Sequence, residues 1–111
     1  IVGRGKDLVI SGGFNVYPKE VESEIDAISG VFESAVIGVA HADFGEGVTA
    51  VVVTDKKTQL DEAGVLRALD GRLAKFKMPK RVIFVDDLPR NAMGKVQKNL
   101  LRDQYETLYK K

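Results

Sequence analysis

Apolar and polar residues follow two different periods along the chain, and the change of period separates strands from helices. Two short extended segments, Asp7 to Ile10 and Phe14 to Tyr17, flank Gly12-Gly13, which predicts a hairpin with a glycine turn. A helix is predicted from Pro18 to Gly30, because proline suits the first helical position. Its apolar positions recur at helical spacing and are Val21, Ile25 and Ile28.

The middle of the chain predicts two longer strands. Val31 to Val39 and Val48 to Thr54 are rich in β-branched residues and apolar on both faces, which is typical of central strands. The glycine-rich loop His41 to Gly47 joins them, and a connection of this length favours antiparallel pairing. A second helix is predicted from Asp61, a good N-cap, to Arg72. Its apolar face is predicted to contain Leu66, Leu69 and Leu73.

The last third predicts one more strand and one more helix. A basic connector, Lys75 to Arg81, leads into the strand Val82 to Val85, and a helix is predicted from Asn99 to Leu108. Its apolar face consists of Leu101, Tyr105 and Leu108. The pattern therefore predicts an α+β fold: a small, mainly antiparallel sheet with flanking helices and an N-terminal two-stranded hairpin.

Composition narrows the class of protein. The 111 residues suffice for one domain, and 44% apolar and 30% charged residues with a net charge of +1 describe a folded chain and argue against a general nucleic-acid binder. Without cysteine and with a single histidine, we expect no metal site. The absence of cysteine is compatible with the cytoplasmic location that we expect. The sequence predicts neither a signal peptide nor a membrane span. Because the chain starts without methionine inside a polar loop, we interpret residues 1–111 as a domain of a longer polypeptide.

The strongest candidate for chemistry is the loop Pro89 to Val96. Gly94 gives its backbone freedom to turn and to present Lys95, whose ammonium group can stabilise negative charge on a phosphate or a carboxylate. The loop is not a phosphate-binding P-loop, because proline occupies position 89 and valine position 96. Judged by composition alone, such a loop is more often a solvated turn, and the connector Lys75 to Arg81 a solvated charge cluster.

Several motifs taken together favour a catalytic function over the interpretation as solvated turns. The segment Gly3 to Glu22 resembles the motif that opens the C-terminal domain of adenylate-forming acyl-CoA synthetases, the superfamily that includes luciferases and peptide-synthetase adenylation domains. Pro89 to Lys95 resembles the motif near that domain's end, and Gly38 to Gly47 matches its middle. Within the superfamily, the sequence looks most like malonyl-CoA synthetases. The resemblance implies a mobile C-terminal domain of an AMP-forming acid–thiol ligase, inactive without its large N-terminal domain.

Such enzymes join a carboxylate to the α-phosphate of ATP and then transfer the acyl group from AMP to CoA, while the small domain rotates between the two steps. By resemblance, Lys95 is the lysine that enters the active site for adenylation, and Lys6 is the hinge. Arg4 matches an arginine near the ribose of the nucleotide. ATP and Mg²⁺ are expected to be bound mainly by the N-terminal domain.

The resemblance also assigns a surface for CoA. Gly12 and Gly13 match the loop that lines the pantetheine tunnel, where a side chain would obstruct the thiol arm. Phe76 and Lys80 match positions that meet the adenine and the phosphates of CoA in some members. Some relatives have arginine at the position of Met78, so the resemblance does not assign the exact contacts to the phosphates of CoA.

Three further expectations concern partners. A lysine on an exposed loop is open to acylation, so a protein lysine acetyltransferase that modifies Lys95 is a possible partner. One alternative is a relative that loads a carrier protein instead of free CoA; the basic segment Lys75 to Arg81 mildly favours CoA. Another is a non-catalytic α+β binding module for protein or nucleic acid that uses the same connector and Phe76.

Overall fold

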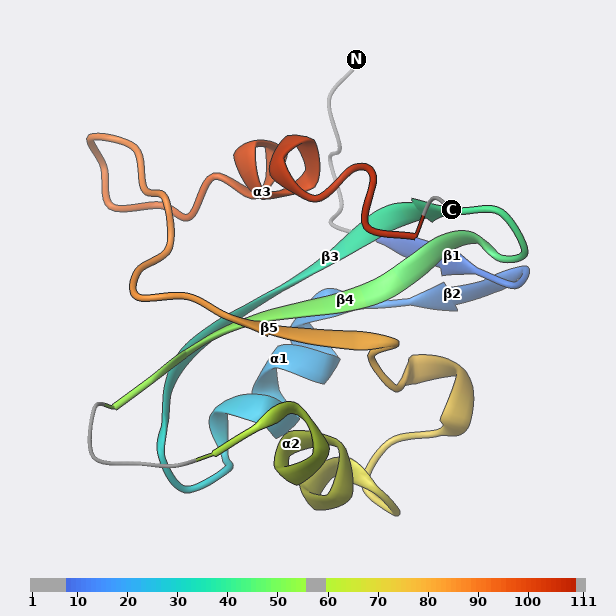
Figure 1. The fold of residues 1–111 in the computed structure, drawn as a ribbon, viewed down its shortest axis with the longest axis horizontal. Helices are drawn as coiled ribbons and strands as arrows, with labels where there is room; N and C mark the ends of the chain where they lie inside the picture. The colour runs from blue at the N-terminus through green and yellow to red at the C-terminus, as the bar shows by residue number, and fades with distance from the viewer. Residues whose placement is uncertain (1–7, 56–59, 110–111) are drawn as a thin grey trace.

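The structure is a computed structural model, and it describes residues 8–55 and 60–109. The chain forms two consecutive pairs of strands, a further single strand, and helices between and after them, as the periods of its apolar residues predict (Figure 1). The elements are β1 (Val9–Ser11), β2 (Phe14–Val16), α1 (Pro18–Asp26), β3 (Val31–His41), β4 (Gly45–Thr54), α2 (Glu62–Leu69), the 3-10 helix η1 (Lys75–Lys77), β5 (Arg81–Phe84) and α3 (Lys98–Gln104).

Strand β4 is the centre of the sheet. Strand β3 pairs with it antiparallel along nearly its whole length, and the β1–β2 hairpin joins the other side, where Ser11 pairs with Gly45. Strand β5 continues this second side but runs parallel to β4. The connection between β4 and β5 carries α2, because parallel neighbours need a crossover. The predicted fold, a mainly antiparallel sheet with flanking helices and an N-terminal hairpin, is confirmed.

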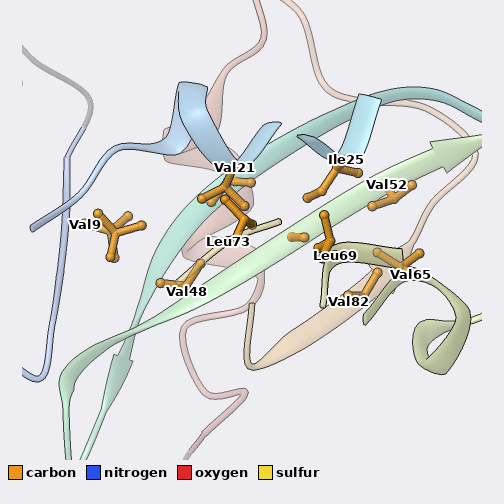
Figure 2. Close-up of a cluster of buried hydrophobic side chains, with 12 residues drawn as sticks. Val9, Val21, Ile25, Val48, Val52, Val65, Leu69, Leu73 and Val82 are labelled. Carbon is orange, nitrogen blue, oxygen red and sulfur yellow. The ribbon is translucent and has the colours of Figure 1, made fainter. Parts of the chain in front are cut away.

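Two apolar cores lie on opposite faces of the sheet. Helices α1 and α2 cover one face, and α3 covers the other (Figure 1). Figure 2 shows the larger core, in which Val21 and Ile25 from α1 meet Val65 and Leu69 from α2 over Val52 of β4. Full burial of such side chains contributes about 1.5–3 kcal/mol each, so both faces stabilise the sheet. The predicted stripes of α1 and α2 lie in this core, although Leu66 is only half-buried and Val65 takes the deeper place.

The prediction that β3 is a central strand is wrong in one respect, because β3 lies at the edge of the sheet. It is apolar on both faces because Val36 faces the α1 core while Ile37 faces the α3 core. The free edge is covered by a side chain: Glu22 of α1 accepts a hydrogen bond from the Val36 backbone N–H at 2.8 Å. Burial on both faces therefore does not identify a central strand here.

Several element ends differ from the predictions. Helix α2 ends at Leu69, because Asp70 is extended with a ψ of 127°, and Gly71 follows with a left-handed φ of 83°. Helix α3 ends at Gln104, and the residues after it run as turns to Tyr109. The predicted loop between β3 and β4 shortens to 42–44, because both strands extend into it. The basic connector contains one 3-10 turn, η1.

Candidate functional site

Lys95 lies in a small hairpin that the backbone and one side chain hold in shape. Arg90 and Val96 form an antiparallel bridge at its base. The Gly94 N–H donates to the Asn91 carbonyl at 2.9 Å, and Gly94 has a φ of 82°, which favours glycine. The Asn91 side-chain oxygen Oδ1 accepts from the N–H groups of Met93 at 2.9 Å and Lys95 at 3.0 Å. Asn91 thus organises the turn, a role that the sequence analysis missed.

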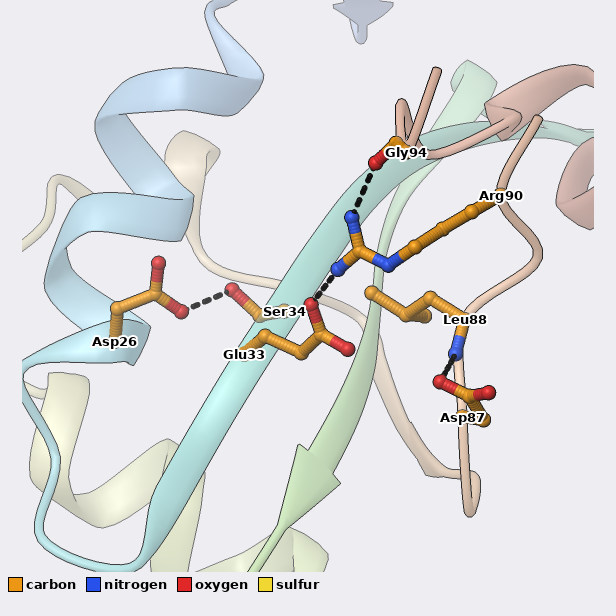
Figure 3. Close-up of polar contacts among 7 residues, drawn as sticks. All are labelled: Asp26, Glu33, Ser34, Asp87, Leu88, Arg90 and Gly94. Atoms are coloured by element: carbon orange, nitrogen blue, oxygen red, sulfur yellow. Dashed lines mark hydrogen bonds and ion pairs between the residues drawn. The ribbon is translucent and has the colours of Figure 1, made fainter. Parts of the chain in front are cut away.

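The hairpin is fixed to the sheet by a guanidinium group. Arg90 donates through Nη1 to the Gly94 carbonyl at 2.7 Å, and its Nη2 forms an ion pair with Glu33 of β3 (Figure 3). The buried Leu88, just before the hairpin, packs in the α3 core. Lys95 is exposed at the tip, beside Met93, which is 91% exposed. The loop therefore presents an ammonium group on a braced turn that buries little of its own surface.

Gly12 and Gly13 lie at the turn between β1 and β2, as predicted. Their φ values are 60° and 83°, which side-chain-bearing residues rarely adopt. The Gly12 N–H donates to the Phe44 carbonyl at 2.9 Å and ties this turn to the turn between β3 and β4. A Cβ at Gly12 would lie 3.1 Å from the Phe44 ring, whereas one at Gly13 would meet nothing within 4 Å. Gly13 thus faces open space.

Aromatic rings and a lysine surround this turn. The Phe76 ring stacks on Phe14 with centroids 4.6 Å apart, and Lys80 Nζ lies 3.6 Å from the centroid of the Phe44 ring. Phe14 and Phe76 remain 54% and 37% exposed, so the stacked pair presents an aromatic surface to solvent. Neither Phe14 nor Phe44 was among the predicted site residues; their place beside Gly12-Gly13 and the glycine-rich loop was the available signal.

Tyr109, the last described residue, packs at the same end of the sheet as Gly12 and Gly13. The Tyr109 hydroxyl lies 2.8 Å from Thr49 Oγ1, and its ring lies 4.9 Å from that of His41. Desolvation by burial raises the pKa of Tyr109 above its usual 10.0, while the hydrogen bond with Thr49 opposes this shift. A Cβ at Gly47 would lie 2.8 Å from the Tyr109 ring, so glycine is needed for this packing. This contact joins two residues that are 60 positions apart, so no local pattern could predict it.

The two candidate sites lie at opposite ends of the sheet. Glu33, which holds the Lys95 hairpin, is near the start of β3, and the Gly12–Phe44 contact lies just beyond its end at His41. Eight residues of strand at about 3.3 Å each separate the two positions by roughly 26 Å. Figure 1 agrees: the loop of Lys95, in orange, and the β1–β2 turn lie at opposite sides of the view.

The structure therefore brings four of the predicted site residues together and leaves one apart. Gly12, Gly13, Phe76 and Lys80 share one end of the sheet, and Lys95 lies at the other. The predicted nucleotide-binding and hinge residues, Arg4 and Lys6, lie outside the described residues.

Three further observations complete the description of the described residues. The half-buried Met78 packs against the larger core, so its side chain stabilises the domain, and an arginine there would meet apolar neighbours. Within residues 8–55 and 60–109, no group of three or more acidic, histidine or cysteine side chains could hold a metal ion. Over the same residues no helix is long and apolar enough to cross a membrane.

The sequence and the fold are similar to those of known proteins. Residues 20–95 match the model of the AMP-binding enzyme C-terminal domain, so the chain belongs to that family. A long-chain-fatty-acid–CoA ligase, FadD13 of Mycobacterium tuberculosis, is 47% identical over 105 residues, which are 95% of this chain and 21% of that protein. The ligase of Rhodococcus jostii that acts on a methyl-dioxo-octahydroindenyl propanoyl group is 52% identical over 104 residues, 94% of this chain and 20% of that protein.

A solved structure is similar over nearly the whole chain. The apo crystal structure of MatB from Rhodopseudomonas palustris superposes with a TM-score of 0.94 at 78% identity and covers 99% of this chain and 22% of MatB. The ATP-bound form of MatB is equally similar, with a TM-score of 0.94 at 77% identity. The chain thus spans about a fifth of the length of the relatives that it matches.

Proposed function

We propose that the intact protein is an ATP-dependent, AMP-forming acid–CoA ligase, and that this chain is its mobile C-terminal domain, residues 1–111. Membership of the family supports the domain, and curated relatives that are acid–CoA ligases support the reaction. The observation that carries the proposal is the separation of two different sites on one domain: an exposed lysine at one end and a glycine turn among rings at the other. A domain that rotates between two steps needs such a pair.

We propose malonate as the acid. MatB is a malonyl-CoA synthetase, and 78% identity over nearly the whole chain supports a shared substrate. The acyl pocket that selects malonate is proposed to lie in the large N-terminal domain.

In the adenylation step, Lys95 is proposed to contact the carboxylate and the phosphate oxygens together. Two anions repel each other, and a cation between them lowers that repulsion as charge redistributes in the transition state. The hairpin suits this task, since Asn91 and Arg90 fix its backbone while the Lys95 side chain stays exposed. Removing one preorganised donor of this kind typically costs about 2.7–4 kcal/mol.

In the thioester step, the opposite end is proposed to face the active site. Gly12 and Gly13 would line the path of the thiol arm, which the open space beside Gly13 supports. The partly exposed Phe76 ring would meet the adenine of CoA, and Lys80 would attract its phosphates. This cation and this aromatic pair favour CoA over a carrier protein as the acceptor. We propose Lys6 as the hinge and Arg4 as a contact to the nucleotide ribose.

The nucleotide and its metal ion are assigned to the rest of the protein. ATP and Mg²⁺ would be bound mainly by the large N-terminal domain. We also propose a cytoplasmic protein whose Lys95 can be acetylated by a protein lysine acetyltransferase. Acetylation would remove the charge that adenylation needs, and the exposure of Lys95 supports access.

The direct test measures the products of the intact protein with ATP, Mg²⁺, CoA and a series of carboxylic acids. We expect pyrophosphate, AMP and malonyl-CoA, with malonate giving the highest kcat/KM. Acyl transfer to a carrier protein but not to CoA would replace the proposed acceptor, and no acid-dependent pyrophosphate release would contradict the ligase. Isotope labelling of Lys95 by acetyl-CoA and an acetyltransferase, read by mass spectrometry, tests the modification.

A further inference from the structure

Two positively charged residues flank Lys95 along the chain, and each is paired with a glutamate of another element. Arg90 precedes the hairpin and pairs with Glu33 of β3. Lys98 follows it at the start of α3, and its Nζ lies 2.8 Å from Glu22 Oε2 of α1. The segment that carries Lys95 is thus anchored on both sides to elements that it does not neighbour in sequence.

The Arg90 anchor joins two acceptors with one planar group. Nη1 donates to the Gly94 carbonyl, directly before Lys95, and Nη2 pairs with Glu33 (Figure 3). A guanidinium group holds such a geometry because its donors form a rigid fork. The position of the Lys95 backbone therefore depends on where Glu33 holds Arg90.

The Glu22 anchor lies across the free edge of the sheet. Oε2 of Glu22 accepts from the Val36 N–H at 2.8 Å and from Lys98 at the same distance. Glu22 and Lys98 are only 17% and 19% exposed, so solvent screens this pair less than a surface pair. Because α1 and α3 cover opposite faces, the pair connects the two layers around the edge of β3.

We propose that Glu33 and Glu22 are positioning residues for adenylation, which act through Arg90 and Lys98 to hold the loop of Lys95 in a productive orientation. Neither glutamate touches substrate in this assignment. The inference rests on the proposed function of Lys95 and adds the residues that direct it.

The physical reason is that Lys95 itself is exposed and its loop buries little surface. Packing cannot fix such a loop, so polar contacts must do so, and displacement of a reacting group by about 1 Å can cost roughly 100-fold in rate. Partly exposed ion pairs contribute little to global stability. Loss of Glu33 should therefore change the rate of one reaction step more than it changes folding.

The test uses the intact enzyme with Glu33→Gln and Glu22→Gln, which keep the side-chain shape and a carbonyl acceptor but remove the charge. We expect acid-dependent ATP–pyrophosphate exchange to fall about 10–100-fold, and conversion of a supplied acyl-adenylate to acyl-CoA to stay within about twofold. The unchanged second step also certifies that the variants are folded. Glu24→Gln is the matched control, because it removes a similar pair, with Arg72 at 3.6 Å, away from the Lys95 loop.

A double-variant cycle distinguishes positioning from other roles. In a Lys95→Ala background, Glu33→Gln should lower pyrophosphate exchange by less than about twofold, because its effect passes through Lys95. An equal loss in both backgrounds, an equal loss of both steps, or a normal exchange rate in both glutamine variants would overturn this inference alone. An unchanged rate in Lys95→Ala would overturn the proposed role of Lys95 and this inference with it.

Discussion

The two ends of the sheet are built by different means. At the Lys95 end, the Asn91 amide, the Arg90 guanidinium and the carboxylate of Glu33 shape an exposed polar hairpin. At the Gly12–Gly13 end, aromatic rings surround a turn without side chains. The difference fits the two proposed tasks, since one step needs a charge placed among anions and the other needs room for a thiol arm beside a surface for a nucleotide.

The C-terminal segment spans both ends. Helix α3 begins just after the Lys95 hairpin, and the turns that follow it carry Tyr109 to His41 and Thr49 (Figure 1). One continuous segment therefore connects the two ends of the sheet. We still expect a substitution at one end to affect only the reaction step that is assigned to that end.

The largest expected effect at the glycine end comes from Gly13→Leu. The leucine has open space in this domain but would project where the thiol arm is proposed to pass. We expect acyl transfer to CoA to fall about 100-fold or more, while pyrophosphate exchange is retained. Gly71→Leu is the matched control, because Gly71 has the same φ of 83° and equally open surroundings. Both should lose about 1–2 kcal/mol of stability, and equal enzymatic effects would break the comparison.

A smaller effect is expected for Asn91→Ala at the lysine end. The substitution removes the acceptor for the Met93 and Lys95 N–H groups and loosens the turn. Pyrophosphate exchange should fall about 10-fold, with acyl transfer from a supplied adenylate unchanged. Asn99→Ala, at an exposed position of α3, provides the control. If Asn91→Ala lowered acyl transfer and left pyrophosphate exchange unchanged, the proposed role of Asn91 in adenylation would be contradicted.

A weaker change is expected for Phe76→Ala. The loss of the stack on Phe14 and of the proposed contact with adenine should raise the KM for CoA about 3–10-fold and leave pyrophosphate exchange unaltered. Phe32→Ala, which truncates a highly exposed ring on β3, should change neither quantity. An unchanged KM for CoA in Phe76→Ala would argue against the nucleotide surface.

The smallest effect concerns alkaline pH. The pKa of Tyr109 is raised in the folded chain, so the unfolded state ionises first and the contribution of this group to stability is lost as pH rises above about 10.0. Tyr109→Phe should reduce that alkaline loss, at the cost of the hydrogen bond with Thr49. Denaturant unfolding at pH 8 and above pH 10 measures this, with Tyr105→Phe for comparison. An unchanged alkaline slope in Tyr109→Phe would contradict the assignment.

Local sequence signals predicted which segments form helices and strands. They did not predict equally well which elements lie next to each other in the sheet. The helix of Val21 and Ile25 and the turn at Gly12-Gly13 follow from spacing and glycine chemistry, and both are confirmed. The edge position of β3 could not be predicted, because helices on both faces give it the same composition as a central strand. The parallel pairing of β5 likewise depends on where α2 crosses.

The candidate sites divide in the same way. The turn that carries Lys95 is formed by residues that are neighbours in the sequence, so Gly94 was sufficient to predict it. Its anchor Glu33 lies 57 residues before Arg90, and Tyr109 lies 60 residues after Thr49, so no periodicity relates the partners. Resemblance to a family indicated the residues that are proposed to touch substrate. It did not indicate the residues that are proposed to position them, because those contacts arise only in the packed structure.

The most direct test of the two-ended account measures both half-reactions of the intact Lys95→Ala enzyme. ATP–pyrophosphate exchange should fall by about 10²–10³, because a preorganised cation is lost, while a supplied acyl-adenylate is still converted to acyl-CoA at close to the original rate. An equal loss of both half-reactions would contradict the division of labour between the two ends of the sheet.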